Sequence, residues 1–340
     1  MKRLNILLCA AVLAALAASC AKNDPTGSND ANKRYLEAWM KIHHPDAAKS
    51  GLGVYIIDEQ QGSGKEAGSS EDFPFAFVSY TITDLEGNVS ETTDADLSKQ
   101  VGTYKKGSYY GPVIRLRNST SMTAGQEIVL NGMRTGGSRK AVIPGWFNTK
   151  QVRYNSEDGY MANVTGDDTI LSLTLHDVIK DITAWQLDSM ARYMAHTFHS
   201  VPDSLKYGFY YFQTKEPSDT NSFTSGSTVR INYTGQMLNG QVFDTTDEKT
   251  AKDWDIYSES KTYNPVTVKM ADDYTEIKFS TSSGDTGLIK GFAYCLSRMK
   301  TGEKGTCIFY SDLGYEATGS GSIPTYSPLR FDIEMLGATK

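Results

Sequence analysis

An internal repeat is the feature of this sequence that most limits how the chain can fold. Apolar runs that begin at Gly53 and Gly208 start the two copies. Tyr80 lies 27 residues after the first glycine, and Tyr233 lies 25 residues after the second. Alternating runs end the copies, at residues 169–178 and 329–336. A chain of 340 residues has room for two domains and a tail, so two tandem copies of one domain account for this order.

The second copy contains a strong hairpin signal. Apolar and polar residues alternate over 229–233, the period of a strand with one buried face. The dipeptide at 239–240 is Asn-Gly, which favours a type I′ turn because both of its central residues need a positive φ. The hairpin would bring Tyr233, Phe243 and Asp244 to one region.

This hairpin and five further blocks resemble the FKBP-type peptidyl-prolyl isomerases over roughly residues 205–338. The further blocks are residues 288–292, 299–304, 312–315, 319–324 and 329–334. The resemblance implies an α+β fold with two tandem FKBP-like domains, each a curved antiparallel sheet wrapped around a short helix.

The resemblance also assigns nine site residues by motif. The pocket walls would be Tyr233, Phe243, Leu288, Phe292, Ile323 and Phe331. The backbone N–H of Ile289 and the hydroxyl of Tyr315 would donate hydrogen bonds to the substrate. Asp244 would orient its neighbours and polarise the site without acting as a base.

The implied reaction needs no cofactor. Rotation about a peptide bond has a barrier of about 18–20 kcal/mol because the bond is partly double. A dry apolar pocket favours the twisted amide, whose charge separation is smaller, and so acts by binding the transition state better than the ground state. Neither a nucleophile nor a metal is required.

Two features of the second copy depart from the family. Phe292 stands where the family usually has tryptophan. An insertion of about 35 residues, 245–280, contains Trp254, Tyr257 and Tyr263. It could be a flap over the pocket, a surface that grips substrate, or a plug.

The first copy lacks most of the aromatic wall. Tyr80 remains, but Ser90 and Glu91 stand where the second copy has Phe243 and Asp244. The position of Phe292 falls near Gln126, leucine replaces Phe331, and Trp146 is a ring of open placement. We therefore expect an FKBP-like fold without isomerase activity, serving as a spacer, a dimerisation unit or a substrate-binding arm.

The N-terminus resembles a bacterial lipoprotein signal. Lys2 and Arg3 precede an apolar run at 6–18, and small residues precede Cys20, which would be lipidated. An ordinary secretory signal or an anchor helix are the alternatives. The lipid alone would hold the protein to a membrane, and the cell envelope, at the outer membrane with a periplasmic or surface face, is the expected location.

The expected domain plan has five parts. They are a signal peptide at 1–20, a polar tether and short helix at 21–49, a degenerate domain at 50–180, a linker helix at 181–204, and an isomerase domain at 205–340. The apolar stripe of the first helix, which includes Tyr35, Leu36 and Ile42, would pack on the next domain or form a dimer contact. Thr183 is the expected N-cap of the linker helix.

Charge and side-chain chemistry narrow the partners. The chain has 34 basic and 40 acidic residues without a basic block, which argues against nucleic-acid binding. His196 and His199 lack ligand partners at metal-site spacing. Cys295 and Cys307 are expected to be free, buried thiols. The oligomeric state is left open.

The leading hypothesis is a proline isomerase that assists the folding of exported or envelope polypeptides, whose slow X-Pro isomerisation delays folding. The first alternative is an inactive FKBP-like lipoprotein that binds peptides or proteins. A second, suggested by the 20 tyrosines, is a glycan-binding surface protein.

Overall fold

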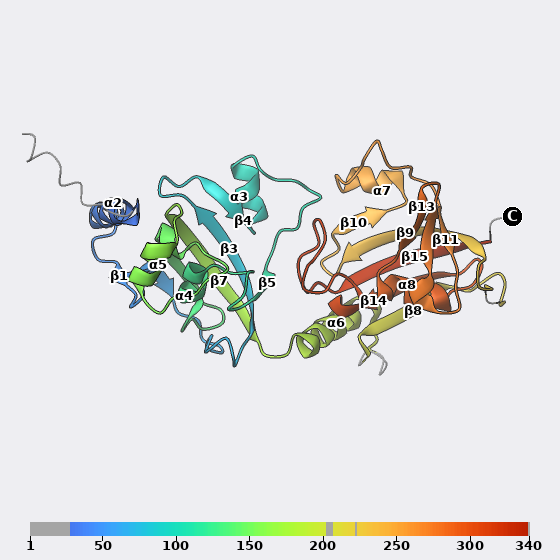
Figure 1. The fold of residues 1–340 in the computed structure, drawn as a ribbon. Coiled ribbons are helices and arrows are strands. Elements are labelled where there is room, and N and C mark those ends of the chain that lie inside the picture. The colour runs from blue at the N-terminus through green and yellow to red at the C-terminus, as the bar shows by residue number, and fades with distance from the viewer. Residues whose placement is uncertain (1–27, 202–206, 222, 339–340) are drawn as a thin grey trace, which may run out of the picture.

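The computed structural model describes residues 28–201, 207–221 and 223–338, and these form two α+β domains. Each domain has its own sheet and its own hydrophobic core. Figure 1 shows the domains side by side, with the helix α6 (Ile182–Phe198) running between them along one edge. The predicted fold class is confirmed. The predicted signal segment and Cys20 lie outside the described residues.

The sheets share one topology. The N-terminal sheet contains β1 (Ala48–Lys49), β2 (Tyr55–Gln60), β3 (Phe75–Thr83), β4 (Val89–Thr92), β5 (Val113–Leu116), β6 (Ser138–Ile143) and β7 (Thr169–Ile179). The C-terminal sheet contains β8 (Phe209–Lys215), β9 (Thr228–Met237), β10 (Val242–Thr245), β11 (Val266–Lys269), β12 (Lys278–Thr281), β13 (Gly284–Gly287), β14 (Lys304–Phe309) and β15 (Leu329–Ala338). The order β2-β6-β7-β3 in the first repeats as β8-β14-β15-β9 in the second. Because β4 and β5 pair with β3 as β10 and β11 pair with β9, the repeat seen in the sequence is one topology built twice.

Short helices complete both domains. Within the described ranges, the α-helices besides α6 are α2 (Ser28–His43), α3 (Ala95–Gln100), α4 (Ala124–Leu130), α5 (Glu157–Asn163), α7 (Glu248–Asp253) and α8 (Lys290–Arg298). Single 3₁₀ turns lie at Gly145–Phe147, Tyr274–Glu276 and Ser311–Leu313. The matching helices α4 and α8 contribute apolar side chains to the two cores. A capping box fixes the start of α4, where the Thr123 side chain accepts from Gln126 N–H and the Gln126 side chain accepts from Thr123 N–H.

Period-2 burial places the cores. Along β15, Leu329, Phe331, Ile333 and Met335 are buried, while the residues between them are more exposed. The same alternation holds along β9 from Val229 to Met237. The face that these strands bury packs against α8, as a strand with one covered face requires.

The predicted type I′ turn is wrong. Gly240 has a φ of +89°, but Asn239 is not among the residues with positive φ. Gly240 N–H donates to Met237 C=O, and Met237 N–H donates to Gln241 C=O, each at 2.9 Å. The loop therefore has three residues and places its one left-handed residue at the glycine, as in a type I turn followed by a bulge.

The helix α2 packs on the N-terminal domain. Leu36 and Met40 are buried in its core, and Trp39 packs against it. Asn29, which heads the helix, donates its side-chain amide to the carbonyls of Met161 and Val164, each at 2.6 Å.

Part of the predicted apolar stripe of α2 is not covered. Tyr35 and Ile42 are 57% and 76% exposed. They lie outside the arc that faces the core, because a contact with one domain covers only one side of a helix.

The linker helix α6 is anchored to the second domain. Asp181, not the predicted Thr183, is its N-cap, and its carboxylate accepts from Ala184 N–H at 3.0 Å. Gln186 is fully buried and forms two hydrogen bonds with Ser311. Met190 and Met194 pack in a small core with Ile308 of the second sheet, so this helix is part of the second domain's outer layer.

Two further sequence expectations concern cysteines and membrane spans. Cys295 and Cys307 are free and buried, which confirms the prediction, and burial raises the pKa of the Cys295 thiol. Within the described ranges, no helix has the length and apolar character needed to cross a membrane.

Replacing Leu36 by alanine tests the packing of α2. Leu36 is 1% exposed, so Leu36→Ala should lower the free energy of unfolding of the N-terminal domain by about 2–4 kcal/mol through lost burial and a residual cavity. Tyr35→Ala, at an exposed position of the same helix, should change it by less than about 0.5 kcal/mol. Urea unfolding followed by circular dichroism measures both, and equal effects would contradict the assigned packing.

Candidate functional site

The nine residues predicted for the site come together on the helix side of the second sheet. Strands provide Tyr233 (β9), Phe243 and Asp244 (β10), and Phe331 (β15). Leu288 and Ile289 immediately precede α8, which carries Phe292, and Tyr315 and Ile323 lie in the chain between β14 and β15. Eight of the nine belong to or pack against one apolar cluster, and Asp244 joins it through Tyr233.

Four aromatic rings form the centre of this cluster. The ring centroids of Phe292 and Phe331 are 4.7 Å apart, and those of Tyr233 and Phe292 are 5.3 Å apart. Phe243 meets Phe331 edge to face at 5.6 Å. These are the separations at which aromatic pairs attract beyond simple burial.

The cluster has a buried floor and a more accessible rim. Tyr233, Phe292, Ile323 and Phe331 are buried. Phe243, Leu288, Ile289 and Tyr315 are only partly buried. A ligand that binds here would contact the partly exposed side chains at the rim and the buried apolar side chains beneath them.

Gly235 makes room for the rings. It pairs with Phe331 in the ladder between β9 and β15. A Cβ atom at this position would lie 2.7 Å from the ring of Phe243 and 2.8 Å from the ring of Phe331. Contacts this short do not occur for real Cβ atoms, so the arrangement of these two rings requires glycine here.

Hydrogen bonds fix the carboxylate of Asp244. The Tyr233 hydroxyl donates to Asp244 Oδ2 at 2.6 Å. Lys261 forms an ion pair with Oδ1, which also accepts from Thr245 N–H at 2.9 Å. With both oxygens engaged, the carboxylate of Asp244 is held in one orientation.

The two site tyrosines keep their protons. Burial raises the pKa of Tyr233, and the negative charge of Asp244 raises it further. Burial and Asp244 likewise raise the pKa of Tyr315. Both hydroxyls are therefore hydrogen-bond donors at neutral pH.

A main-chain donor lies at the start of α8. Ile289 is its N-cap residue, with extended backbone angles (φ −64°, ψ 143°) and no side-chain cap. Among the described residues, no acceptor is recorded for its N–H. Groups at a helix start lack partners within the helix, so this N–H is available to a ligand carbonyl.

The insertion borders the site and adds groups that the sequence reasoning missed. The ring of Phe279 on β12 lies 5.9 Å from that of Phe292 and 6.1 Å from that of Tyr233. Lys261 reaches Asp244 from the loop that follows α7. In the sequence, only the alternation of apolar and polar residues in the short strand β12 could have indicated that Phe279 faces the core. The pairing of Lys261 depends on how the insertion folds.

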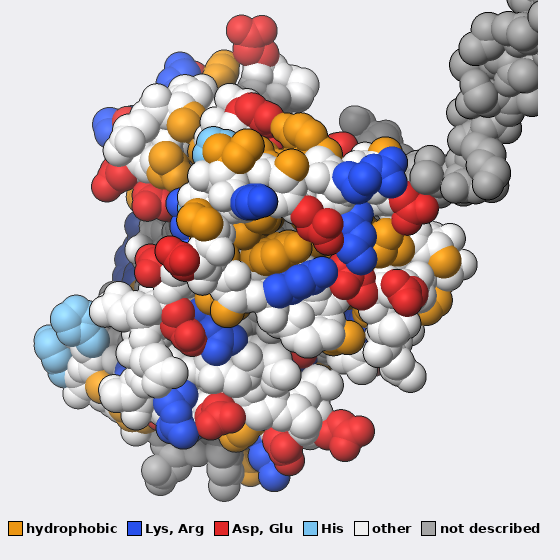
Figure 2. Space-filling model, turned by 90° about the vertical axis from the view of Figure 1, so that its left-hand side faces the viewer, with side chains coloured by type: hydrophobic (Ala, Val, Ile, Leu, Met, Phe, Trp, Pro, Cys, Tyr) orange, Lys and Arg blue, Asp and Glu red, His pale blue; other side chains and the backbone are white. Residues whose placement is uncertain are grey.

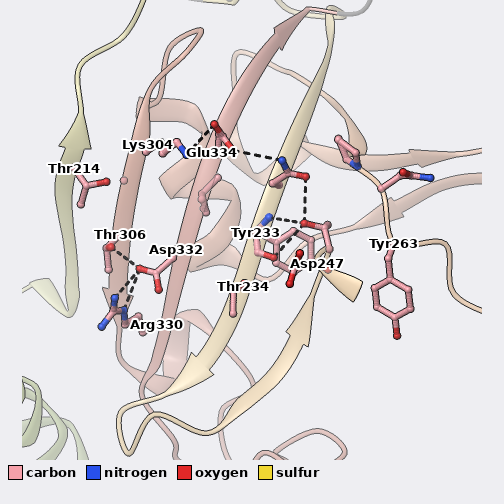
Figure 3. Close-up of a pocket in the computed structure, with 16 residues that line it drawn as sticks. Thr214, Tyr233, Thr234, Asp247, Tyr263, Lys304, Thr306, Arg330, Asp332 and Glu334 are labelled. Carbon is pink, nitrogen blue, oxygen red and sulfur yellow. Dashed lines mark hydrogen bonds and ion pairs between the residues drawn. The ribbon is translucent and has the colours of Figure 1, made fainter. Parts of the chain in front are cut away.

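A second hollow lies on the other face of the same sheet. It has a volume of about 650 Å³ and is lined mainly by polar side chains, including Asn232, Thr234 and Thr306 (Figure 3). Two ion pairs border it, Arg330 with Asp332 and Lys304 with Glu334. Arg330 and Asp332 flank Phe331 on β15 and so point to the opposite face of the sheet. Of the four clustered rings, only Tyr233 borders this hollow, so most of the aromatic cluster lies outside it.

The first domain has a polar group equivalent to the one around Asp244 in the second domain. The Tyr80 hydroxyl donates to Glu91 and accepts from Arg115, and Arg115 pairs with Glu91 at 3.7 Å. Burial raises the pKa of Tyr80 to about 12. Tyr80, Glu91 and Arg115 thus parallel Tyr233, Asp244 and Lys261.

The described part of the first domain has no aromatic residues at the strand positions equivalent to Phe243 and Phe331. Ile82 pairs with Glu91 and with Leu171, as Gly235 pairs with Asp244 and Phe331. The isoleucine side chain occupies the position that glycine leaves open in the second domain. Trp146 is buried in the core of the first domain, next to Phe147.

Substitution of Gly235 tests whether the rings depend on it. Gly235→Ala should displace Phe243 or Phe331 and lower the free energy of unfolding of the second domain by about 1–3 kcal/mol. Gly287→Ala is the matched control, because it also lies in a strand and its Cβ would meet nothing within 4 Å. Denaturant unfolding and the aromatic circular dichroism band report the two effects. An unchanged band in Gly235→Ala would mean that the rings do not need the space.

Comparison with known proteins relates the second domain to a known family. Residues 219–336 match the family model described as FKBP-type peptidyl-prolyl cis-trans isomerase. The "Macrophage infectivity potentiator" of Trypanosoma cruzi is 30% identical over 107 residues, which are 31% of this chain and 40% of that protein. "FK506-binding protein 2" of Dictyostelium discoideum is 32% identical over 114 residues, 33% of this chain and 66% of that protein.

A third relative is the "Probable FKBP-type peptidyl-prolyl cis-trans isomerase" of Haemophilus influenzae, 30% identical over 117 residues, 34% of this chain and 37% of that protein. The chain thus matches between 37% and 66% of the length of these relatives. Residues 219–336 of this chain belong to the FKBP-type peptidyl-prolyl cis-trans isomerase family.

Proposed function

We propose that the second domain isomerises Xaa-Pro bonds in polypeptides outside the cytoplasm and that the first domain does not. The observation that supports this most directly is the cluster of four aromatic rings, Tyr233, Phe243, Phe292 and Phe331. The N–H of Ile289 and the hydroxyl of Tyr315 lie beside this cluster as hydrogen-bond donors. The family match and the relatives, which are named as isomerases or binding proteins, support the same activity.

The proposed mechanism is stabilisation of a twisted amide. The proline ring would rest on the aromatic floor, and the N–H of Ile289 would hold a substrate carbonyl. In the planar amide, resonance places partial charges on nitrogen and oxygen. Apolar walls solvate these charges poorly, whereas the twisted form has smaller charges and loses less on leaving water. This difference lowers the barrier, and every 1.4 kcal/mol is roughly a factor of ten in rate.

The first domain cannot offer the same floor. Ile82 and Leu171 stand where the second domain has Gly235 and Phe331, and Ser90 stands where it has Phe243. We therefore propose a non-catalytic role for this domain.

The competing function is peptide binding without catalysis. Lys261, held on Asp244 from the insertion, supports it, because the insertion could restrict access to the cluster. Measuring binding and catalysis on the same variants separates the two.

Aromatic truncation tests the proposed activity. In the chain from residue 21 onward, which lacks the lipidated Cys20, Phe243→Ala should lower kcat/KM for an Xaa-Pro tetrapeptide by roughly tenfold or more, because it removes a wall that contacts the twisted proline. Tyr35→Ala, an exposed aromatic in α2, should leave the rate unchanged. NMR exchange or a protease-coupled assay measures both. Peptide binding without catalysis in the unmodified chain would support the competing function.

We further propose that lipid on Cys20 anchors the protein to the cell envelope. Cys20→Ser should move the protein from the membrane fraction to the soluble fraction of bacterial cells and abolish incorporation of an alkyne-labelled fatty acid. Cys9→Ser, within the same N-terminal segment, should change neither result. Labelling that persists in Cys20→Ser would refute the assignment of this residue.

A further inference from the structure

A cavity lies between the two domains, beside the aromatic cluster. Its volume is about 370 Å³, and both domains line it. The first domain contributes its tyrosine–carboxylate–arginine group, Tyr80, Glu91 and Arg115, together with Ser108. The second contributes residues of the loop before β15, among them Ile323. Figure 1 shows this loop and the loop between α3 and β5 approaching each other between the domains.

Ile323 connects the cavity with the aromatic cluster. It is buried and packs in the core that holds Tyr233, Phe292 and Phe331. It also lines the cavity. Ile323 thus belongs both to the aromatic core and to the wall of the cavity, so a polypeptide bound at the cluster could extend past this residue into the cavity.

The domain contacts on one side of the cavity come from the loop between α3 and β5. Gln241 donates its side-chain amide to Gly107 C=O at 3.1 Å. Lys106 donates to the carbonyl of Asp253 and lies over the ring of Trp254, 5.6 Å from its centroid. A Cβ atom on Gly107 would lie 2.9 Å from the Ile256 side chain, so the approach is close.

Contacts on the other side fix the loop before β15. The Thr325 hydroxyl donates to Ile114 C=O at 3.0 Å. The ring of Tyr326 meets that of Phe75 edge to face at 5.1 Å. The cavity therefore has walls on two sides that interdomain contacts hold in place.

The cavity lining suits an uncharged main chain. Its one arginine and one glutamate, Arg115 and Glu91, pair with each other, and so present no net charge. Six hydroxyl side chains of Ser and Thr line it: Thr92, Thr93, Ser108, Thr318, Ser322 and Thr325. Thr93, Thr318 and Thr325 already donate their hydroxyl hydrogens to carbonyls of the protein. A hydroxyl oxygen that donates can also accept, so these groups can still bond main-chain N–H groups of an extended segment regardless of its sequence.

We infer that the first domain forms part of the substrate site, and that its Tyr80–Glu91–Arg115 side of the cavity binds the uncharged polypeptide segment next to the isomerised proline. This assignment rests on the proposed isomerase function of the second domain. It gives the non-catalytic domain a role as a substrate-binding arm. Substrates with chain beyond the proline would then bind better than short peptides.

Filling the cavity from the first domain tests the inference. Ser108→Trp changes the lining while leaving the catalytic domain's own residues intact, and Ser63→Trp, exposed on another loop of the first domain, is the matched control. Both are made in the chain from residue 21 onward, which contains both domains. The probes are an Xaa-Pro tetrapeptide and a longer peptide with six additional uncharged residues on each side, which extend about 20 Å each way.

The expected result depends on peptide length. The unmodified chain should process the long peptide with a kcat/KM three to ten times that of the tetrapeptide, through a lower KM. Ser108→Trp should remove this advantage and leave the tetrapeptide rate within twofold, while Ser63→Trp should change neither. Arg115→Leu, which opens the ion pair from β5, should also reduce the advantage. Thermal unfolding identifies any variant that is not folded.

Binding separates failure of this inference from failure of the proposed function. Fluorescence anisotropy of the labelled long peptide should show a three- to tenfold weaker affinity in Ser108→Trp. If the chain lacks isomerase activity but shows this loss, the cavity assignment stands and the catalytic proposal falls. If both peptides bind and react equally in the unmodified chain and in Ser108→Trp, the cavity assignment is overturned.

Discussion

The absence of a side chain at Gly235 is the constraint on which the aromatic site depends. Phe243 and Phe331 occupy the space that a Cβ atom would need, since that atom would lie within 2.8 Å of both rings. Phe331 in turn contacts Phe292 and Tyr233, and Tyr233 holds Asp244. A single position on the central strand thus determines whether the helix side of the sheet can hold a group of aromatic rings.

The two domains show what happens when that constraint is relaxed. With Ile82 at the equivalent strand position, the first domain lacks the counterpart of the Phe243–Phe331 pair and keeps the polar group around Tyr80. The aromatic rings in its core, such as Trp146 and Phe147, come from another part of the chain. Its sheet order is unchanged, because strand pairing depends on alternation and not on which apolar residue is used. The fold and the site are therefore separable in this chain.

Acidic and basic side chains are interspersed on the end of the molecule that the first domain forms (Figure 2).

Sequence reasoning found what is local or repeated. Alternation located β9 and β15, and the motif blocks located the residues that meet at the aromatic cluster. It failed where one extra residue changes a turn, as at Asn239, and where two acceptable caps compete, as at Asp181 and Thr183. Lys261 and the interdomain cavity were out of reach, because they depend on how an insertion and two domains pack, and no periodicity records such contacts.

The linker helix limits which insertions and deletions the chain can accept. Because α6 is continuous from Asp181 and is fixed to the second domain by Gln186 and its methionines, it couples the orientation of the domains to its own residue count. An α-helix turns by about 100° per residue, so inserting or deleting one residue before Gln186 would swing the first domain around the helix axis. The number of residues at the start of this helix is therefore constrained by the relative orientation of the two domains.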